Sequence, residues 1–187
     1  MAVCDRFMYV GIDPGLDGAI TFIDDRNHTV ASVVVPTIKM EKGSAKRIYD
    51  SSAMVDLLVQ YVDNISMVCV EKGRAAPGQG VTSMFRFGYG CGLWEGILAA
   101  LRVPYMVVHP RTWQKVVCTG MTGDAKSRAM QAAKSMFPTL DLKASSRSTK
   151  PHQGKADATC IAFYAKAFNR SLLVDTAIDL KQFSEPF

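Results

Sequence analysis

The sequence predicts an α/β fold built on a mixed five-stranded sheet flanked by helices. Three short segments rich in β-forming residues lie at hairpin spacing near the start of the chain, at residues 7–12, 19–23 and 30–35. From residue 50 onward, strand-like segments alternate with segments of helical periodicity. Hairpins pair antiparallel and strands joined by helices pair parallel, so one sheet should contain both kinds of pairing.

The first third of the chain has a signal at each boundary. Asp13-Pro14-Gly15 follows the first segment and predicts a turn, and Pro36 ends the third segment. Residues 37–48 are polar and basic, which predicts a loop. A helix is then expected from about Asp50 to about Asp63. Its apolar residues recur at helical spacing, at Met54, Leu57, Leu58 and Tyr61.

The middle of the chain alternates strands and helices. Residues 66–70 predict a buried strand that ends at Glu71, and residues 105–108 predict the fifth strand. Between them, a glycine-rich loop at 72–80 leads into a long helix at about 81–101. Glycines recur every four residues on this helix, which predicts close packing against another backbone. That backbone is either a second copy of the chain or, as we favour, the domain's own sheet. The glycines are Gly88, Gly92 and Gly96.

The last third is predicted to be mainly helical. Short helices are expected at about 111–117 and 124–136, and a final helix at about 154–168. The segment at 138–153 is rich in Ser, Lys and Pro and predicts a mobile loop. Residues 1–187 are expected to form one domain, with a C-terminal tail from about 170 of unclear role.

Composition excludes several classes of protein. Apolar residues make up 48% of the 187 residues, which is typical of a globular domain rather than a disordered chain. No apolar run approaches the roughly 18 residues of a membrane helix, and the first ten residues lack the apolar stretch of a signal peptide. Five scattered cysteines without a CxxC pair argue against a disulfide framework or a zinc site. We therefore expect a cytoplasmic protein with no membrane association.

The positive charge is concentrated in two segments. The chain has 22 Lys and Arg against 17 Asp and Glu, a net charge of +5. Residues 126–155 carry seven Lys and Arg against Asp141 alone, a net +6, and residues 39–47 carry a net +3. The rest of the chain is therefore mildly acidic. Two basic segments on an acidic body favour a polyanionic partner, although solvated surface charges would look the same.

Three acidic residues stand where α/β folds assemble their sites. Asp13 and Glu71 each end a predicted strand, and Asp157 lies near the start of the last helix. Taken singly, such residues more often serve turns, surfaces or helix ends. Together they offer the oxygen ligands that Mg²⁺ or Mn²⁺ prefers, and two such ions can activate water for phosphodiester cleavage.

Three motifs resemble those of RuvC-type Holliday junction resolvases. Gly11-Ile12-Asp13-Pro14-Gly15-Leu16 looks like the family's opening motif, and Val70-Glu71 with the following loop and helix looks like its second motif. His152-Gln153-Gly154-Lys155-Ala156-Asp157-Ala158 looks like its C-terminal acidic helix. The segments Pro-Gly-Gln-Gly and Met-Phe-Arg-Phe-Gly are most similar to the phage and prophage members. The resemblance spans about residues 7–168.

The resemblance implies an RNase H-like fold and a homodimer that binds branched DNA, namely a four-way junction. It implies paired nicks by metal-activated water, leaving 5′-phosphate and 3′-hydroxyl ends, with Asp13, Glu71 and Asp157 as metal ligands and catalytic residues. It implies Mg²⁺ or Mn²⁺, two ions per active site. A phage-infected host or a bacterial cytoplasm is the implied location.

One position departs from the family's pattern. Many members carry a further acid three residues before the last one, where this chain has Gly154. We expect His152 to be the fourth metal ligand and a catalytic residue, with Asp17 as a second choice. Lys155 is a candidate contact to the scissile phosphate, although a solvated lysine would fit its position equally well.

Candidate DNA contacts surround the predicted acidic site. Lys72 and Arg74 follow Glu71 directly and could contact the backbone beside the cut. Aromatic residues at 85, 87 and 89 could stack on an unpaired base, although their spacing places at least one of them in the core. Trp94 is expected in the core and Trp113 is undecided. The full set of predicted DNA-binding residues is Lys72, Arg74, Phe85, Arg86, Lys143, Arg147 and Lys150.

Two alternatives stay open. The same carboxylates would serve an RNase H-like nuclease that cuts flaps or RNA–DNA hybrids, and Gly154 leaves room for a junction-binding protein without catalysis. A sugar-kinase or actin-like ATPase also begins with Gly-Ile-Asp-x-Gly, but it needs two such domains and a second phosphate loop, which the sequence lacks. We therefore expect no nucleotide cofactor.

Overall fold

Five strands form the central sheet of the protein. The structure, a computed structural model, describes residues 7–41, 47–73, 78 and 80–182. The strand order is β3-β2-β1-β6-β7. β1 pairs antiparallel with β2, and β2 with β3, whereas β6 is parallel to both β1 and β7. The predicted mixed five-stranded sheet is therefore confirmed. The strands are β1 (Met8–Asp13), β2 (Ala19–Asp24), β3 (Thr29–Val34), β6 (Ile65–Glu71) and β7 (Tyr105–Val108).

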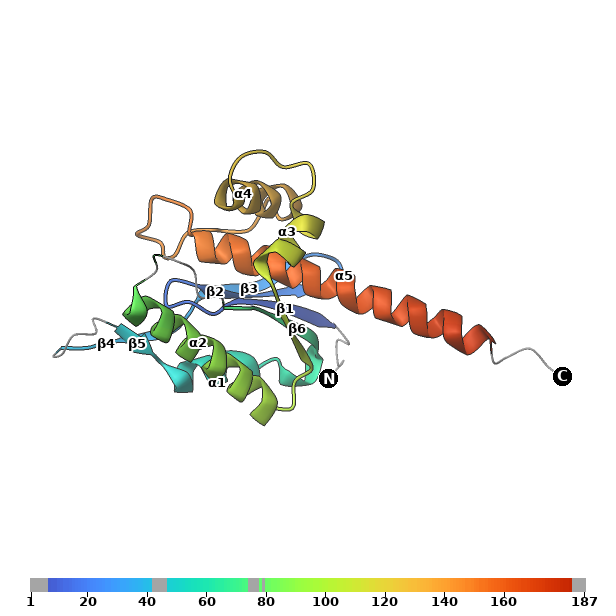
Figure 1. Ribbon diagram of the computed structural model, residues 1–187, viewed down its shortest axis with the longest axis horizontal. Helices are drawn as coiled ribbons and strands as arrows, with labels where there is room; N and C mark the ends of the chain where they lie inside the picture. Colours follow the sequence, from blue (N-terminus) through green and yellow to red (C-terminus); the bar gives the residue numbers. More distant parts are fainter. Residues whose placement is uncertain (1–6, 42–46, 74–77, 79, 183–187) are drawn as a thin grey trace.

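Helices cover both faces of the sheet (Figure 1). One face carries α1 (Ser51–Val59) and α2 (Val81–Ala100). The other carries α3 (Pro110–Val117), α4 (Ala125–Met136) and α5 (Gln153–Gln182). Side chains along a strand alternate between the two faces, so Tyr9 packs with α5 while Val10 packs with α2. Within the described residues, no helix is long and apolar enough to cross a membrane.

The expected elements are present, with three corrections. Residues 37–48 are not simply a loop, because β4 (Thr37–Lys39) and β5 (Arg47–Tyr49) pair antiparallel in a separate two-stranded sheet. α1 is capped by Asp50, which accepts a hydrogen bond from Ala53 N at 3.1 Å, but it ends at Val59 and a 3₁₀ turn (Val62–Asn64) follows. α5 extends well past the predicted end, to Gln182.

Backbone hydrogen bonds hold the segment before α5 in place, whereas its composition predicts a mobile loop. Lys143 and Pro151 form an isolated β-bridge, and Ser148 N donates to Ser145 O at 3.0 Å. Leu142 is buried in the core beneath the segment, and its carbonyl accepts from His152 N at 2.7 Å. Residues 138–152 therefore form an anchored loop that leads directly into α5.

α5 packs against the backbone of β1 and of the β1–β2 turn. A Cβ atom on Gly11 would lie 2.0 Å from Ala158 O and 2.2 Å from Ala162 N, so a side chain there has no room. At the start of the helix, a Cβ on Gly154 would lie 2.6 Å from Asp17 O. Two glycines, one on each partner, therefore allow this close approach of helix and sheet.

The three glycines spaced by four on α2 do not pack on the sheet, so that prediction was wrong. Gly88, Gly92 and Gly96 are exposed, and nothing lies within 4 Å of a Cβ built on any of them. Gly90 instead faces inward, where a Cβ would lie 2.2 Å from the Tyr49 hydroxyl. Gly90 lies two residues from both Gly88 and Gly92, which is about half a turn around the helix. It therefore faces the sheet side of α2 while the other glycines face outward.

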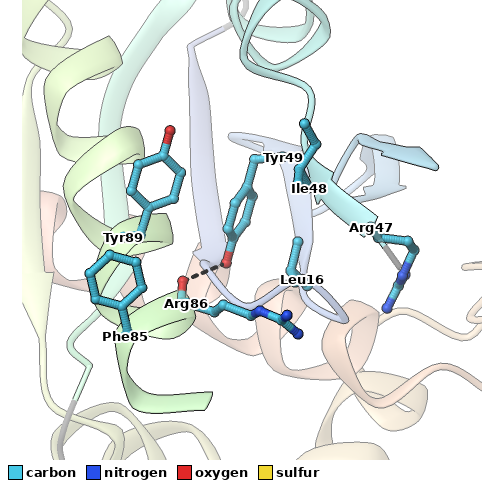
Figure 2. Close-up of a pocket in the computed structure, with 7 residues that line it drawn as sticks. All are labelled: Leu16, Arg47, Ile48, Tyr49, Phe85, Arg86 and Tyr89. Carbon is cyan, nitrogen blue, oxygen red and sulfur yellow. Dashed lines mark hydrogen bonds between the residues drawn. The ribbon is translucent and has the colours of Figure 1, made fainter. Parts of the chain in front are cut away.

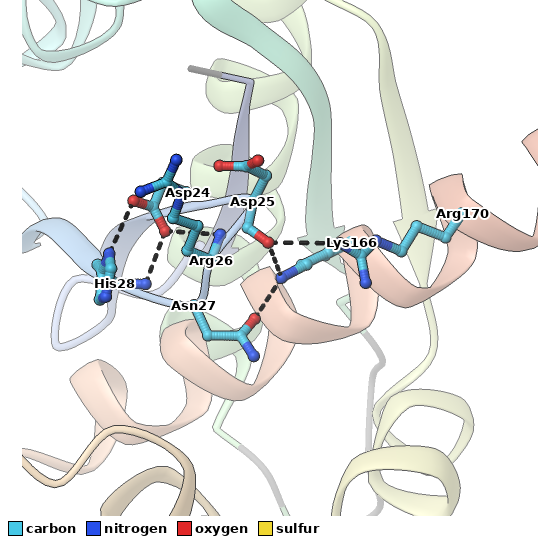
Figure 3. Close-up of polar contacts among 7 residues, drawn as sticks. All are labelled: Asp24, Asp25, Arg26, Asn27, His28, Lys166 and Arg170. Atoms are coloured by element: carbon cyan, nitrogen blue, oxygen red, sulfur yellow. Dashed lines mark hydrogen bonds and ion pairs between the residues drawn. The ribbon is translucent and has the colours of Figure 1, made fainter.

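A polar cluster fixes α5 to the turn between β2 and β3 (Figure 3). Lys166 is buried, and its Nζ donates to Asp25 O at 2.6 Å and to Asn27 Oδ1 at 2.5 Å. Asp24, also buried, accepts the backbone N–H of His28 at 2.7 Å and lies 3.1 Å from His28 Nδ1. Burial alone would raise the pKa of Asp24, but these hydrogen bonds outweigh it and lower the pKa. These contacts fix the position of α5 beyond the part of the helix that packs on β1.

Replacing Gly11 by Ala is expected to destabilise the fold by about 3 kcal/mol or more, the upper end of overpacking costs, because the obstructing atoms are backbone. The free energy of unfolding in urea measures the effect. Gly88→Ala is the matched control, since its site is open and alanine should stabilise the helix by up to about 1 kcal/mol. Equal stabilities of the Gly11 variant and the wild type would contradict the close packing.

Candidate functional site

Asp13, Glu71 and Asp157 come from three elements that meet at one edge of the sheet. Asp13 and Glu71 are the last residues of the parallel neighbours β1 and β6, whose register pairs Ile12 with Val70. The carboxyl ends of parallel strands lie at the same edge, so these two side chains emerge together. Asp157 lies in the second turn of α5, one residue before the Ala158 carbonyl that would meet a Cβ on Gly11. The packing of α5 on β1 therefore brings the third acid to this edge.

Burial and neighbouring charges raise the pKa values of all three acids, and the charge of Asp13 acts on both of the others. Burial raises the pKa of Asp13 to about 6 against the opposing hydrogen bond of Gly15, and the charge of Asp17 adds to the rise. Burial and the charge of Asp13 raise the pKa of Glu71 to about 7, with a smaller contribution from Asp157. Burial and the charge of Asp13 also raise the pKa of Asp157 to about 7. The three acids therefore form one electrostatic group of like charges at a poorly solvated place.

Among the described residues, each carboxylate has one hydrogen-bond donor. Gly15 N lies 3.3 Å from Asp13 Oδ1, within the turn that follows β1. Trp113 Nε1 donates to Glu71 Oε1 at 2.9 Å, and Gln153 Nε2 donates to Asp157 Oδ1 at 3.0 Å. These donors orient the oxygens without neutralising the charge.

Trp113 and Gln153 are site residues that the sequence reasoning missed. Trp113 is fully buried in the core, and no local pattern links it to Glu71, which lies 42 residues away. Gln153 stands four residues before Asp157, a spacing that places two side chains on one face of a helix and could have revealed the contact.

The donor set suits a hard divalent cation. Carboxylate oxygens are the ligands that Mg²⁺ and Mn²⁺ prefer, and a cation would offset the burial of negative charge that chiefly raises the three pKa values. In the part of the chain that the structure describes, no three His, Cys, Asp or Glu side chains are arranged to hold a metal ion as they stand. The chemistry of the residues therefore fits the predicted metal, while its binding geometry is not preformed.

His152 and Lys155 have other contacts in the structure. His152 Nδ1 lies 3.3 Å from Lys155 N, and His152 O accepts from Ala156 N at 3.3 Å, so the residue caps the start of α5. Burial lowers the pKa of His152, and the charge of Asp17 opposes this. Lys155 is buried, and its Nζ donates to Asp141 O at 3.1 Å. The metal role of His152 and the phosphate role of Lys155 stay predictions, and the ammonium would have to leave Asp141 to act.

A cleft of about 800 Å³ opens beside Asp13. The turn between β1 and β2 forms one wall and the start of α2 forms the other, with Arg47 of β5 and Arg86 of α2 contributing cations. Asp17 also lines the cleft and pairs with Arg47 at 2.5 Å. This surface pairs a carboxylate site with basic side chains, as expected for a phosphodiester substrate.

The predicted DNA-binding residues fall into two groups. Lys72, Phe85 and Arg86 lie near the site, on the segment after β6 and on α2, and Phe85 is 73% exposed. The second group lies on the anchored loop, where every member is exposed to solvent. That group is Lys143, Arg147 and Lys150. Arg74 lies outside the described residues. Of the aromatic residues on α2, Phe87 packs inward, where it would touch a Cβ on Gly73 at 2.7 Å, and Trp94 is in the core as predicted.

Comparison with solved structures shows a shared fold. The structure "T. thermophilus RuvC in complex with Holliday junction substrate" matches with a TM-score of 0.58 and 13% identity, over 89% of this chain and 96% of that chain. A second Thermus thermophilus RuvC structure (TM-score 0.47, 16% identity, 87% and 98% covered) and the yeast mitochondrial Holliday junction resolvase Ydc2 (TM-score 0.46, 15% identity, 93% and 83% covered) are also similar. No protein-family model and no curated protein matches the sequence. The first likeness confirms the predicted RNase H-like fold class.

The metal-free protein is expected to lose stability as the pH rises from about 4 to 8. Asp13, Glu71 and Asp157 have pKa values of about 6, 7 and 7 in the folded state, against 3.8, 4.5 and 3.8 ordinarily. The folded state therefore holds protons that the unfolded state has released, and the stability linked to them is lost as the pH passes the folded values. The lowered pKa of Asp24 affects the stability only at pH values below this range. The free energy of unfolding in urea, measured in the presence of a chelator at pH 5 and pH 8, gives the change in stability.

Replacing Asp13 by Asn removes a buried charge that also raises the pKa values of Glu71 and Asp157, and it should stabilise the metal-free protein at pH 8 by the order of 2 kcal/mol. Asp56→Asn, on the exposed side of α1, is the matched control and should change nothing. A wild-type stability that does not vary with pH would contradict the raised pKa values of the three acids. So would an Asp13→Asn variant with the same pH dependence as the wild type.

Proposed function

We propose that the protein is a metal-dependent endonuclease that resolves four-way DNA junctions. The single observation that carries the proposal is the group formed by Asp13, Glu71 and Asp157, three carboxylates that the ends of β1 and β6 and the start of α5 bring to one edge of the sheet, where Asp13 lines a cleft with Arg47 and Arg86. The shared fold with a junction-bound RuvC supports the substrate class. The three sequence motifs support it independently, and the finer likeness to phage and prophage members rests on them alone, as does a cytoplasmic location.

In this proposal the three carboxylates, with His152 as a candidate fourth ligand, hold Mg²⁺ or Mn²⁺. When bound, the ions would supply activation of water and stabilisation of the leaving oxygen in phosphodiester hydrolysis. Trp113 and Gln153 keep the Glu71 and Asp157 oxygens in place by their hydrogen bonds. The hydroxyl of water adds to phosphorus, the bond from phosphorus to the 3′ oxygen breaks, and the proton goes to that oxygen. The products carry 5′-phosphate and 3′-hydroxyl ends.

The basic residues would position the DNA. Arg47 and Arg86 face the cleft, and Lys72 is exposed directly after Glu71. Arg74, which follows Lys72 by two residues, extends this basic group in the sequence. The anchored loop carries Lys143, Arg147 and Lys150 to the approach of α5. Phosphate contacts of this kind supply affinity and register rather than sequence readout.

We also propose a homodimer, because one catalytic group makes one nick and a junction needs two. The exposed glycine face of α2 supports this proposal. It adjoins an apolar groove of about 340 Å³, whose lining is Val55, Gly92, Leu93, Gly96, Ile97, Ala100 and Leu101. Small residues on a helix allow a second backbone to approach closely, and an uncovered apolar groove favours a partner.

A cleavage assay on four labelled substrates tests the substrate class. The proposal expects paired, symmetric nicks in a four-way junction with Mg²⁺, and much slower cleavage of a plain duplex. Faster cleavage of a flap or an RNA–DNA hybrid would favour the first alternative. Tight junction binding without any nicking in Mg²⁺ or Mn²⁺ would favour the junction-binding protein without catalysis.

The variants Asp13→Asn and Glu71→Gln should abolish nicking in Mg²⁺ and leave junction binding in Ca²⁺ nearly unchanged. Each removes a ligand charge while preserving shape, and the DNA contacts lie on other residues. A loss of at least about 1,000-fold in the single-turnover rate is expected, since ligand loss removes several kcal/mol of transition-state stabilisation. Asp56→Asn serves as the control. Retained nicking, or equal loss of binding and cleavage, would contradict the assignment.

The variant Gly96→Lys should shift the protein from dimer to monomer without unfolding it. Nothing lies within 4 Å of a Cβ at this position, so the lysine fits the monomer, and it should even stabilise the helix by about 1 kcal/mol. Sedimentation velocity at several concentrations measures the oligomeric state. Val116→Lys, an exposed residue of α3 on the opposite side of the sheet, is the control. A wild type that is monomeric at assay concentrations would refute the dimer.

A further inference from the structure

Two cysteines that lie far apart in the sequence meet where α3 packs on α5 (Figure 1). Cys118 directly follows α3, and its N–H donates to Gln114 O at 2.9 Å. Cys160 lies within α5. Both are free thiols buried in the core on this face of the sheet, and their side chains share a hydrogen bond. The two sulfurs are therefore neighbours, and the proposed reaction uses neither of them.

The surroundings of Cys118 favour the ionised form of its thiol. The hydrogen bond from Cys160 lowers the pKa of Cys118, burial opposes this, and the positive charge of Arg128 lowers the pKa further. The Nε atom of Arg128 is buried and has no hydrogen-bond partner within the described part of the chain. The charge of Arg128 also acts on Asp124, at the start of α4. A buried donor without a partner favours an anion nearby, which here is the Cys118 sulfur.

Cys160 is held in the protonated form. Its hydrogen bond with Cys118 and its burial raise the pKa of Cys160, and its Sγ donates to Ala129 O at 3.5 Å. An ionised sulfur beside a protonated one is the arrangement of a reactive pair, in which the first sulfur attacks an oxidant and the second closes the disulfide. Cys69 has the opposite character, because burial raises the pKa of this thiol to about 12 and makes it inert.

The helices that carry the two thiols also carry residues of the carboxylate site. Trp113, which donates to Glu71 Oε1 at 2.9 Å, lies on α3 five residues before Cys118. Asp157 lies on α5 three residues before Cys160, a spacing that places both side chains on one side of the helix. The thiol pair therefore joins the element that orients Glu71 to the element that carries Asp157.

We propose that Cys118 and Cys160 form a disulfide when the protein meets a peroxide, and that this disulfide weakens metal binding at the carboxylate site. The Cys118 sulfur attacks one oxygen of hydrogen peroxide, the O–O bond breaks, and Cys118 becomes a sulfenic acid while hydroxide leaves. The Cys160 sulfur then attacks the Cys118 sulfur, and the sulfenic oxygen leaves as water with the Cys160 proton. The hydroxide takes up the proton that Cys118 had released. Two thiols thereby lose two electrons and two protons, and one peroxide becomes two waters.

The effect on the metal site follows from which helix can move, and this part of the inference rests on the proposed function. Bonded sulfurs lie about 2.05 Å apart, closer than two thiols that only share a hydrogen bond, so the end of α3 and α5 must approach each other. The packing at Gly11 and the contacts of Lys166 fix α5. The short helix α3 therefore moves, and it carries Trp113 away from its position beside Glu71.

Peptide mapping of the folded full chain tests the disulfide. Trypsin cuts after Lys and Arg, so the two thiols fall in separate peptides, residues 116–126 and 156–166, and each peptide holds one cysteine. The protein is treated with equimolar hydrogen peroxide in a chelator, alkylated, and digested without a reductant. We expect these two peptides joined with the loss of two hydrogens, and dithiothreitol should separate them. Oxidation of Cys118 to a sulfinic acid without a link, or a link to another cysteine, would overturn the inference.

Three variants keep the mapping specific. Cys118→Ser and Cys160→Ser should each abolish the link, and circular dichroism checks that they fold. Cys91→Ser, at a half-buried position of α2 on the other face of the sheet, is the matched control and should leave the link unchanged. Because a serine in place of the fully buried Cys160 costs stability, the wild type before and after dithiothreitol provides the comparison that needs no substitution.

Titration calorimetry with Mn²⁺ tests the effect on the metal site. The cross-linked wild type should bind Mn²⁺ about 10-fold more weakly than the reduced protein, the lower end of the effect of losing a hydrogen bond to a metal ligand. Reduction, followed by removal of the reductant, should restore the affinity. Peroxide should leave the affinity of Cys118→Ser unchanged. Equal affinities of the cross-linked and the reduced wild type would overturn this part of the inference.

The outcomes separate this inference from the proposed function, because peptide mapping requires neither metal nor DNA. If the reduced wild type nicks junctions but no link forms, only the inference fails. If the link forms and reverses but the reduced protein neither binds Mn²⁺ nor nicks DNA, the proposed function and the effect on the metal site fail, whereas the disulfide stands.

Discussion

The direct contact between α5 and β1 is the constraint on which the rest of the site depends. A helix normally lies on a sheet through a layer of side chains, but here Gly11 lets the backbone of α5 approach β1 directly. The same approach recurs where Gly154 meets the β1–β2 turn. Asp157 is thereby placed beside the ends of β1 and β6, and the cluster around Lys166 holds the far part of the helix in line. One packing contact therefore assembles a site from three distant parts of the chain.

The same contact explains why this chain lacks an acid at position 154. In the resembling family many members carry an acid there, whereas here any side chain would collide with the carbonyl of Asp17. The three remaining carboxylates are crowded in a poorly solvated place, and their pKa values rise. The fold therefore buries negative charge at a cost in stability that a bound cation would reduce, and functional sites commonly carry such a cost.

Much of this could be predicted from the sequence, because the signals are local. Hydrophobic periodicity located the five sheet strands, and strand ends marked Asp13 and Glu71. The β4–β5 hairpin was missed because its strands are only three residues long and largely polar. The contact between Trp113 and Glu71, the inward Lys155 and the open glycine face of α2 depend on tertiary packing, which no local pattern encodes. The cavity of about 310 Å³ lined by β5, α2 and Leu16 likewise exists only because β5 meets α2 beside the first turn (Figure 2).

A crystal structure of the protein with Mn²⁺, in which anomalous scattering locates the ions, tests the three-carboxylate site most directly. We expect ions bound among Asp13, Glu71 and Asp157, with the α5 contact at Gly11 unchanged. Ions bound elsewhere, or a site in which Asp157 lies apart from the other two carboxylates, would contradict this assignment.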